Sequence, residues 1–194
     1  MLNIQEQNLL ESFESVEYRE EGYHQMIIDI MYRDWQKLYK DKNYEFNVDL
    51  FLKERGEVAA LAVLSGKLNQ QVCNGGFIQY FYNKYSGTDE KLHNTLIELL
   101  TTYFPETNVL PILKEFYIDV DLDITTTEDE YDEELGKWRT VKVDNYDYGS
   151  VINIGFLHDL DTKYYEVNDK FMEELEEFFR NYIFNLQNKY IKGN

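Results

Sequence analysis

The stretch VAALAVLSGKLNQQVCNGGFIQYFYN, residues 58–83, decides the fold. Its first part places small and apolar side chains on one helical face, formed by Val58, Leu61, Ala62, Ser65, Leu68 and Val72. This spacing predicts a central helix. Asn74, Gly75 and Gly76 follow. Because Asn and Gly adopt the left-handed conformation at low cost, we expect one helix to end there and the chain to turn into the next.

The second part of this stretch carries a distinctive mixture of amides and aromatic rings. Gln79 and Asn83 stand four residues apart and share one helical face. Two amides on one face suit a ligand, but they also suit neighbouring backbone groups that need hydrogen bonds when buried. We predict a structural role for the motif, which consists of Asn74, Gly75, Gly76, Phe77, Gln79, Tyr80, Phe81 and Asn83.

The rest of the chain is mostly helical in pattern. Apolar residues recur at helical spacing in residues 4–20, 23–39, 92–103, 109–118 and 168–191. Asn168 is the expected N-cap of the last helix, and Gly193 its expected end. With 2 Pro and 10 Gly in 194 residues, the chain has few of the turns that an all-β fold needs. The prediction is an all-α fold with a single compact domain over residues 1–194, in which the helices of residues 1–54 pack on the remainder.

Residues 119–150 break this pattern. They are strongly acidic and show no sustained helical period, so we expect a long, partly irregular acidic excursion from the helical domain. Within it, Trp138 to Val143 alternates as a short strand does. Asp119, Asp121, Asp123 and Glu130 match the ligand spacing of a calcium loop, but Ile124 stands where the loop needs glycine. We therefore expect no metal site.

The net charge is −18, and it is unevenly distributed. Residues 1–21 carry −5, residues 22–118 carry −2 and residues 119–194 carry −11. Such a chain repels nucleic acid and anionic membranes, because both bind proteins through Lys and Arg. The charge favours a basic protein partner, although an acidic surface also simply aids solubility.

Carboxylates at spacings of three and four residues form rows along the predicted helices, about 4.5–6 Å apart along the axis. Such rows are usually the solvated face of an amphipathic helix. As partner-binding residues we nevertheless single out Glu11, Glu14, Glu17, Glu20, Asp129, Glu130, Asp132, Glu133, Glu134, Glu173, Glu174, Glu176 and Glu177. Glu166 and Asp169 extend the last row.

Catalytic signatures are absent from the sequence. His24, His93 and His158 show no paired ligand spacing, and Asn74-Gly75-Gly76 lacks the Lys and Ser/Thr of a phosphate-binding loop. The only cysteine, Cys73, is expected to be a small core residue. We predict no enzymatic activity and no cofactor.

The string NGGFIQYFYN after a small-residue helix resembles the signature of a bacterial family of unknown function that includes a DNA-mimic protein. Leu160-Asp161 with Tyr164-Tyr165, followed by an acidic helix, is similar to the C-terminal pattern of that family. The resemblance covers about residues 55–185. It implies an all-helical fold, a homodimer and an acidic surface that occupies the DNA-binding face of a transcription factor.

Together, the charge and the resemblance predict a DNA-mimic-like protein that binds the basic surface of a DNA-binding protein, with no direct contact to nucleic acid or membrane. An immunity-type protein that binds a basic toxin is an alternative, as is an acidic structural or calcium-responsive protein. The N-terminus lacks the basic and apolar regions of a signal peptide, so the expected location is the cytoplasm.

Overall fold

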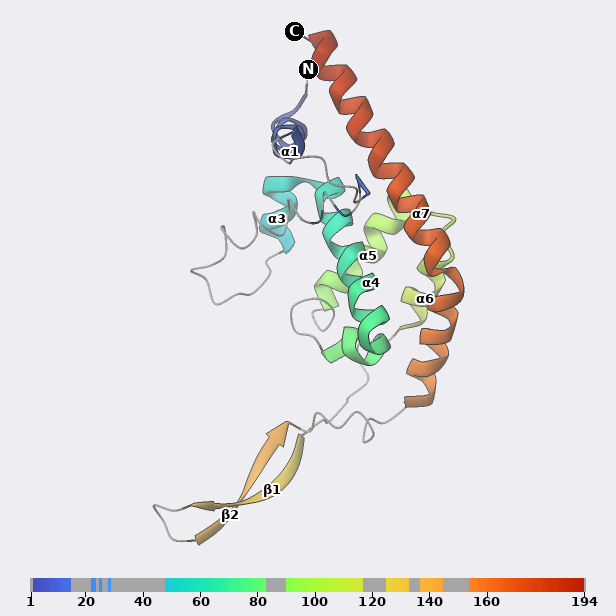
Figure 1. Ribbon diagram of the computed structural model, residues 1–194. Helices are drawn as coiled ribbons and strands as arrows, with labels where there is room; N and C mark the ends of the chain where they lie inside the picture. The colour runs from blue at the N-terminus through green and yellow to red at the C-terminus, as the bar shows by residue number, and fades with distance from the viewer. Residues whose placement is uncertain are drawn as a thin grey trace.

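The computed structural model describes residues 2–14, 22–23, 25, 28, 48–82, 90–116, 125–132, 137–144 and 154–193. Helices and strands follow in the order α1 (Ile4–Glu14), α3 (Val48–Arg55), α4 (Glu57–Tyr82), α5 (Glu90–Tyr103), α6 (Val109–Glu115), β1 (Thr125–Asp132), β2 (Lys137–Asp144) and α7 (Ile154–Gly193). The helices form one body, and the two strands form a hairpin beyond one end of it (Figure 1). The predicted all-α class is confirmed for the body.

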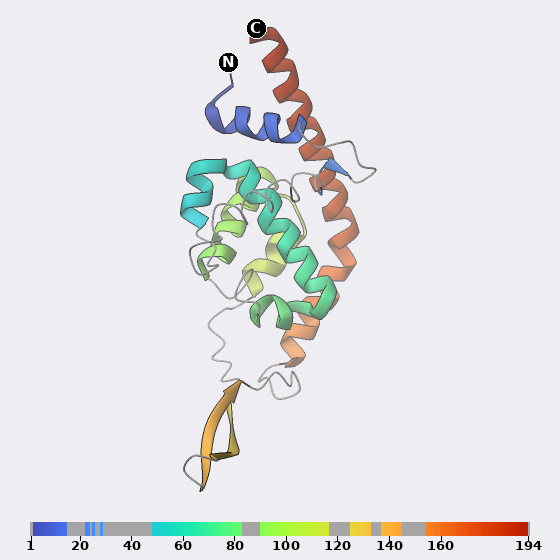
Figure 2. The same ribbon diagram turned by 60° about the vertical axis from the view of Figure 1, so that its left-hand side comes forward.

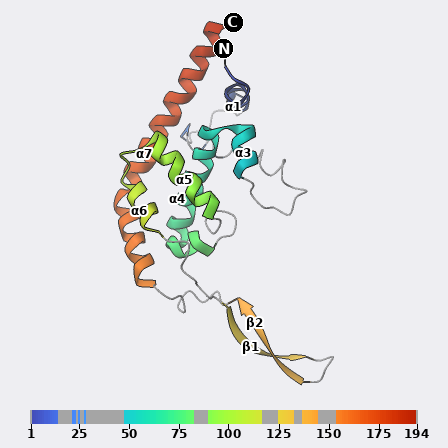
Figure 3. The same ribbon diagram turned by 180° about the vertical axis from the view of Figure 1, so that it is seen from behind.

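Helix α4 lies at the centre of this body. Ala59, Ala60 and Ala62 are fully buried, so neighbouring helices approach its backbone closely. Ser65 is equally buried, and its hydroxyl donates a 2.6 Å hydrogen bond to the Leu61 carbonyl inside the same helix. Helix α5 packs against α4, and α6 packs against α5 and α7, as the view from behind shows (Figure 3). The central helix predicted from residues 58–72 is confirmed.

Helix α7 is the second main element, with 40 residues and a length of about 60 Å at a rise of 1.5 Å per residue. Its first half packs against α4 and α6, and its second half extends past the body to α1 (Figures 1 and 2). The buried stripe consists of Leu160, Tyr164, Phe171, Leu175, Phe179, Ile183 and Leu186. The prediction that Asn168 caps this helix is wrong, because α7 begins fourteen residues earlier, at Ile154, and Asn168 lies within it.

The shorter helices surround this pair. Helix α5 ends before Pro105 as predicted, and α6 contains Pro111 in its first turn. Sequence reasoning missed α3, whose eight residues are too few to show a period, although Val48 and Phe51 are buried. The helix predicted over 4–20 is described as far as Glu14, and the one predicted over 23–39 lies almost entirely outside the described residues.

The acidic excursion contains an antiparallel hairpin. The strand predicted from Trp138 to Val143 is present and runs from Lys137 to Asp144. Its partner β1 was not predicted, because the residues TTTEDEYD carry a single aromatic ring and no alternation of apolar with polar residues. The register places Glu130 opposite Arg139 and Asp132 opposite Lys137. The excursion is therefore more regular than its sequence indicated.

Within the described part of the chain, no helix combines the length and the apolar character that crossing a membrane requires.

Candidate functional site

The motif around Asn74, Gly75 and Gly76 forms a break inside α4. Gly75 (φ −162°, ψ 20°) and Gly76 (φ 73°, ψ −173°) leave the helical conformation, and a new helical segment begins at Phe77. A positive φ at residue 76 favours glycine, because other residues pay for it with steric strain. The predicted turn from one helix into the next is confirmed.

Asp161 of α7 caps the segment that starts at Phe77. Its Oδ1 accepts a 2.6 Å hydrogen bond from the Phe77 backbone N–H, which has no acceptor within its own helix. The carboxyl group packs directly against Gly76, and a β-carbon on residue 76 would lie 2.8 Å from Asp161 Cγ. Only glycine at this position lets α7 supply the cap.

The carboxyl group of Asp161 is mostly enclosed, with 14% of the side chain exposed. Burial raises the pKa of Asp161, while the Phe77 hydrogen bond and His158 act in the opposite direction. Nδ1 of the exposed His158 lies 3.6 Å from Asp161 Oδ2. The cap is therefore an ionisable group held at the interface of α4 and α7.

A buried hydrogen-bond chain joins three helices beside this cap. His93 of α5 lies 3.0 Å from the Leu113 carbonyl through Nε2, and its Nδ1 lies 3.2 Å from the Tyr80 hydroxyl. Because a carbonyl only accepts, Nε2 carries the proton and Nδ1 accepts from Tyr80. Burial lowers the pKa of His93 and raises that of Tyr80. The chain thus stabilises the neutral forms of both groups.

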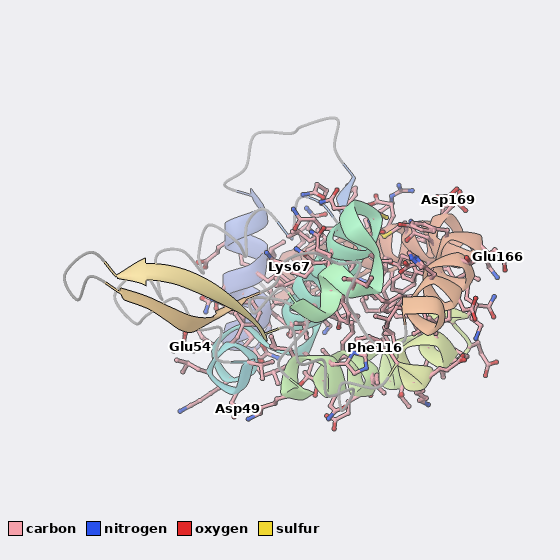
Figure 4. The ribbon with its side chains drawn as sticks, turned by 90° about the horizontal axis from the view of Figure 1, so that it is seen from below. Asp49, Glu54, Lys67, Phe116, Glu166 and Asp169 are labelled. Atoms are coloured by element: carbon pink, nitrogen blue, oxygen red, sulfur yellow. The ribbon has the colours of Figure 1, made fainter. Side chains whose placement is uncertain are left out.

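Aromatic rings surround the same position. The Phe77 ring lies 5.3 Å from Phe116 and 6.0 Å from both Tyr80 and Tyr164, measured between ring centroids. Figure 4 shows Phe116 in the interior of the helical body. Gln79, one of the two motif amides, donates a 2.8 Å hydrogen bond to Gln71 one helical segment earlier. The second amide, Asn83, lies outside the described residues, as do the side-chain contacts of Phe81.

Cys73 is exposed, so its predicted place in the core is wrong. Its thiol lies 3.2 Å from Asn69 Oδ1 and 3.8 Å from Asn168 Nδ2, at the α4–α7 interface. Burial and the charge of Asp169 raise its pKa, which disfavours the reactive thiolate.

The acidic residues of α7 fall into two groups. Glu174 and Glu176 are half-buried and pair with Lys170 at 3.6 Å and with Arg180 at 3.1 Å. Glu166, Asp169, Glu173 and Glu177 are exposed, and within the described ranges none of them has an ion-pair partner. These four, the α7 outer row, lie opposite the buried stripe, and Figure 4 shows Glu166 and Asp169 on the outer side of the helix.

The other predicted partner-binding acids are less well defined. Glu11 is exposed on α1 and accepts a hydrogen bond from Gln7, and Glu14 ends the same helix. Asp129, Glu130 and Asp132 belong to β1. Glu17, Glu20, Glu133 and Glu134 lie outside the described residues. On α7 the structure brings Glu173 and Glu177 together with Glu166 and Asp169 on one exposed face.

Across residues 2–14, 48–82, 90–116 and 154–193, His, Cys, Asp and Glu side chains form no group suited to holding a metal ion. Sequence reasoning missed His93 as a structural residue, because a lone histidine on an apolar face carries no signal of the partners it will meet.

The fold and these contacts define a class: a helical, strongly acidic protein whose central helix is broken at Gly75-Gly76 and capped from α7. The model of the DMP19-like protein family matches residues 56–182, and the chain belongs to this family. It is a DNA-mimic family and not an enzyme family. The match includes the helix break, Asp161 and the α7 outer row. No curated protein and no solved structure matches the chain.

Proposed function

We propose that this protein acts as a DNA mimic, and that the α7 outer row binds the basic surface of a DNA-binding protein. The observation that carries the proposal is the row itself: four exposed carboxylates on one face of α7, none of them neutralised by a described basic residue. From Glu166 to Glu177 the row extends about 16 Å at a rise of 1.5 Å per residue. A duplex likewise presents regularly spaced negative charge along its axis.

The α7 outer row is a better candidate than the other acids. Glu174 and Glu176 are already paired with bases, and the hairpin register places Glu130 and Asp132 opposite Arg139 and Lys137. The ion pairs of Glu174 and Glu176 weaken the field that a partner meets at these two residues. Membership in the DNA-mimic family supports the same reading.

The test compares two variants that remove equal charge. One replaces Glu166, Glu173 and Glu177 by Gln, and the other replaces the exposed Glu54, Glu98 and Glu106 by Gln. Each protein is immobilised and used to capture partners from native lysate at low salt. We expect wild type and the second variant to capture a DNA-binding protein that duplex DNA displaces, and the α7 variant to capture much less of it.

Two outcomes contradict this proposal. A partner that binds the protein and its DNA together refutes mimicry, because a mimic and DNA need the same cationic surface. A captured basic nuclease that DNA does not displace supports the immunity-type alternative.

Because exposed charges act mainly on association, the loss of partner binding in the α7 variant should appear in the on-rate.

We also propose that the protein is a homodimer. Ile4, Phe184 and Ile191 are 68%, 62% and 72% exposed, where α1 and the end of α7 lie side by side. Phe184 and Ile191 stand seven residues apart on one face of α7, and a second copy would remove them from water. Light scattering after gel filtration tests this, with Phe184→Ser and Ile191→Ser expected to give the monomer mass.

A further inference from the structure

A cavity of about 480 Å³ lies where α1, α3, the first turn of α4, the end of α5 and α7 meet. Figure 2 shows α1 lying across this end of the body, between α3 and α7. Leu9, Leu52 and Val58 provide apolar lining. The volume is in the range of small-molecule sites. The cavity lies at the start of α4, away from the break at Gly75-Gly76, and on α7 it is lined by Tyr182, beyond the last residue of the outer row.

One wall of the cavity carries the Glu57 carboxylate and the rings of Tyr103 and Tyr182. Tyr103 donates a 2.8 Å hydrogen bond to Glu57 Oε2. Burial, followed by this bond, raises the pKa of Tyr103 to about 12. Burial and the nearby charge of Glu6 raise the pKa of Tyr182, whose ring lines the same wall. The hydrogen bond to Tyr103 engages one oxygen of Glu57, and the carboxylate forms no ion pair with a described residue.

The cavity also has a basic side. Lys53 lies at the end of α3, and Gln5 fixes the backbone there by donating a 2.8 Å hydrogen bond to the Lys53 carbonyl. The Lys53 ammonium forms no ion pair within the described residues, and it does not pair with Glu57, although both line the cavity. Glu6 and Arg55 also line the cavity, but Glu6 pairs with Lys189 at 3.0 Å and Arg55 has an interaction of its own. Lys53 and Glu57 are therefore the two lining charges of opposite sign that no described ion pair neutralises.

We propose that this cavity binds a free α-amino acid with an apolar side chain. The ligand carboxylate faces Lys53, the ligand ammonium faces Glu57, and the side chain lies on Leu9, Leu52 and Val58. A simple anion would leave Glu57 unpaired beside it, and a simple cation would leave Lys53 unpaired. A zwitterion satisfies both charges at once, and no other function proposed for the protein requires this site.

The experiment uses the full chain and three matched probes: L-phenylalanine, phenylalaninamide, which lacks the carboxylate, and 3-phenylpropionate, which lacks the ammonium. Binding is measured by titration calorimetry and by the shift in melting temperature. We expect saturable binding of L-phenylalanine at millimolar concentration. Each of the other probes should bind about fivefold more weakly, since each loses one partly exposed ion pair.

Two variants assign the charges. Lys53→Met should weaken L-phenylalanine about fivefold and leave phenylalaninamide unchanged, and Glu57→Gln should weaken L-phenylalanine and leave 3-phenylpropionate unchanged. The Gln side chain still accepts the Tyr103 hydrogen bond, so the wall stays intact. Lys91→Met, on the exposed face of α5, is the control and should change nothing. Equal binding of the three probes, or no saturable binding of L-phenylalanine, overturns the proposal.

Discussion

At the scale of single residues, the fold depends on the contact between Gly76, which has no side chain, and the carboxylate of Asp161. Gly76 has φ 73°, and Asp161 occupies the space where its β-carbon would stand. The aspartate in turn accepts the Phe77 N–H at 2.6 Å. Gly76 leaves room for the Asp161 carboxylate, and Asp161 caps the helical segment that begins after Gly76. We therefore expect substitutions at the two positions to lower the free energy of unfolding by different amounts.

Gly76→Ala should lower the free energy of unfolding by about 2–4 kcal/mol, because it adds left-handed strain to the displacement of the cap. Gly56 provides the comparison, since its φ is 84° and its β-carbon would lie 3.0 Å from Gln5 Oε1, where it displaces no helix cap. Gly56→Ala should cost about 1–2 kcal/mol, mostly from backbone strain. Urea denaturation measures both. Equal costs would mean that the contact with Asp161 contributes nothing.

Asp161→Ala should cost about 1–2 kcal/mol, the usual loss when a helix N-cap is removed. Asp159, two residues earlier on α7, is exposed and makes no described hydrogen bond, so Asp159→Ala should change stability by less than about 0.5 kcal/mol. Thermal and urea unfolding of the pair give the comparison. If the two variants unfold alike, Asp161 is not a cap of energetic importance.

At the scale of elements, His93 joins α4, α5 and α6 through its two ring nitrogens. Burial lowers its pKa, so between the folded and unfolded pKa values the unfolded chain binds more protons. Stability must then fall as the pH drops below about 6.5, the ordinary histidine value.

We expect the wild type to lose more unfolding free energy between about pH 7.5 and about pH 5 than His93→Gln does, because glutamine has no charge to gain. Comparing each protein with itself cancels the effects of the other titrating groups. Asp161, with its raised pKa, acts in the opposite direction and nearer to pH 4, and it is present in both proteins. Parallel pH profiles would show that His93 does not titrate on unfolding.

The elements also show how far sequence reasoning reaches. Long periodic stretches such as residues 58–72 and 92–103 were predicted well, because their apolar spacing reflects burial directly. Helix α3 was too short to show a period, and β1 pairs through backbone groups that its sequence does not reveal. The break at Gly75-Gly76 was predictable from glycine chemistry. Its cap was not, because the sequence does not show that Asp161 reaches it.

At the scale of the whole molecule, the dominant fact is the net charge of −18. Some of it is offset locally, as where Lys163 pairs with Glu115 and Lys189 with Glu6. The α7 outer row is not offset by any described base. Such an excess of one sign destabilises the compact state by self-repulsion.

Raising sodium chloride from about 0.1 M to about 0.5 M should therefore raise the melting temperature, since the Debye length of about 10 Å at 0.1 M shrinks and repulsion weakens. A gain of about 1 kcal/mol corresponds to about 2–4 °C for a chain of this size. The variant with Gln at 166, 173 and 177 should show a smaller rise. A melting temperature that stays constant or falls with salt would mean that the acids are already neutralised.

The long sequence separation of the α4–α7 contact has a consequence for biosynthesis. The acceptor of the Phe77 N–H lies 84 residues further along the chain. At 5–20 residues per second, a ribosome needs about 4–17 s to add them. During that interval the nascent α4 exposes Leu68, Val72 and Phe77 without the helix that will cover them. The chain is therefore expected to complete its folding only after most of α7 has left the ribosome, and until then α4 is the segment a chaperone would protect.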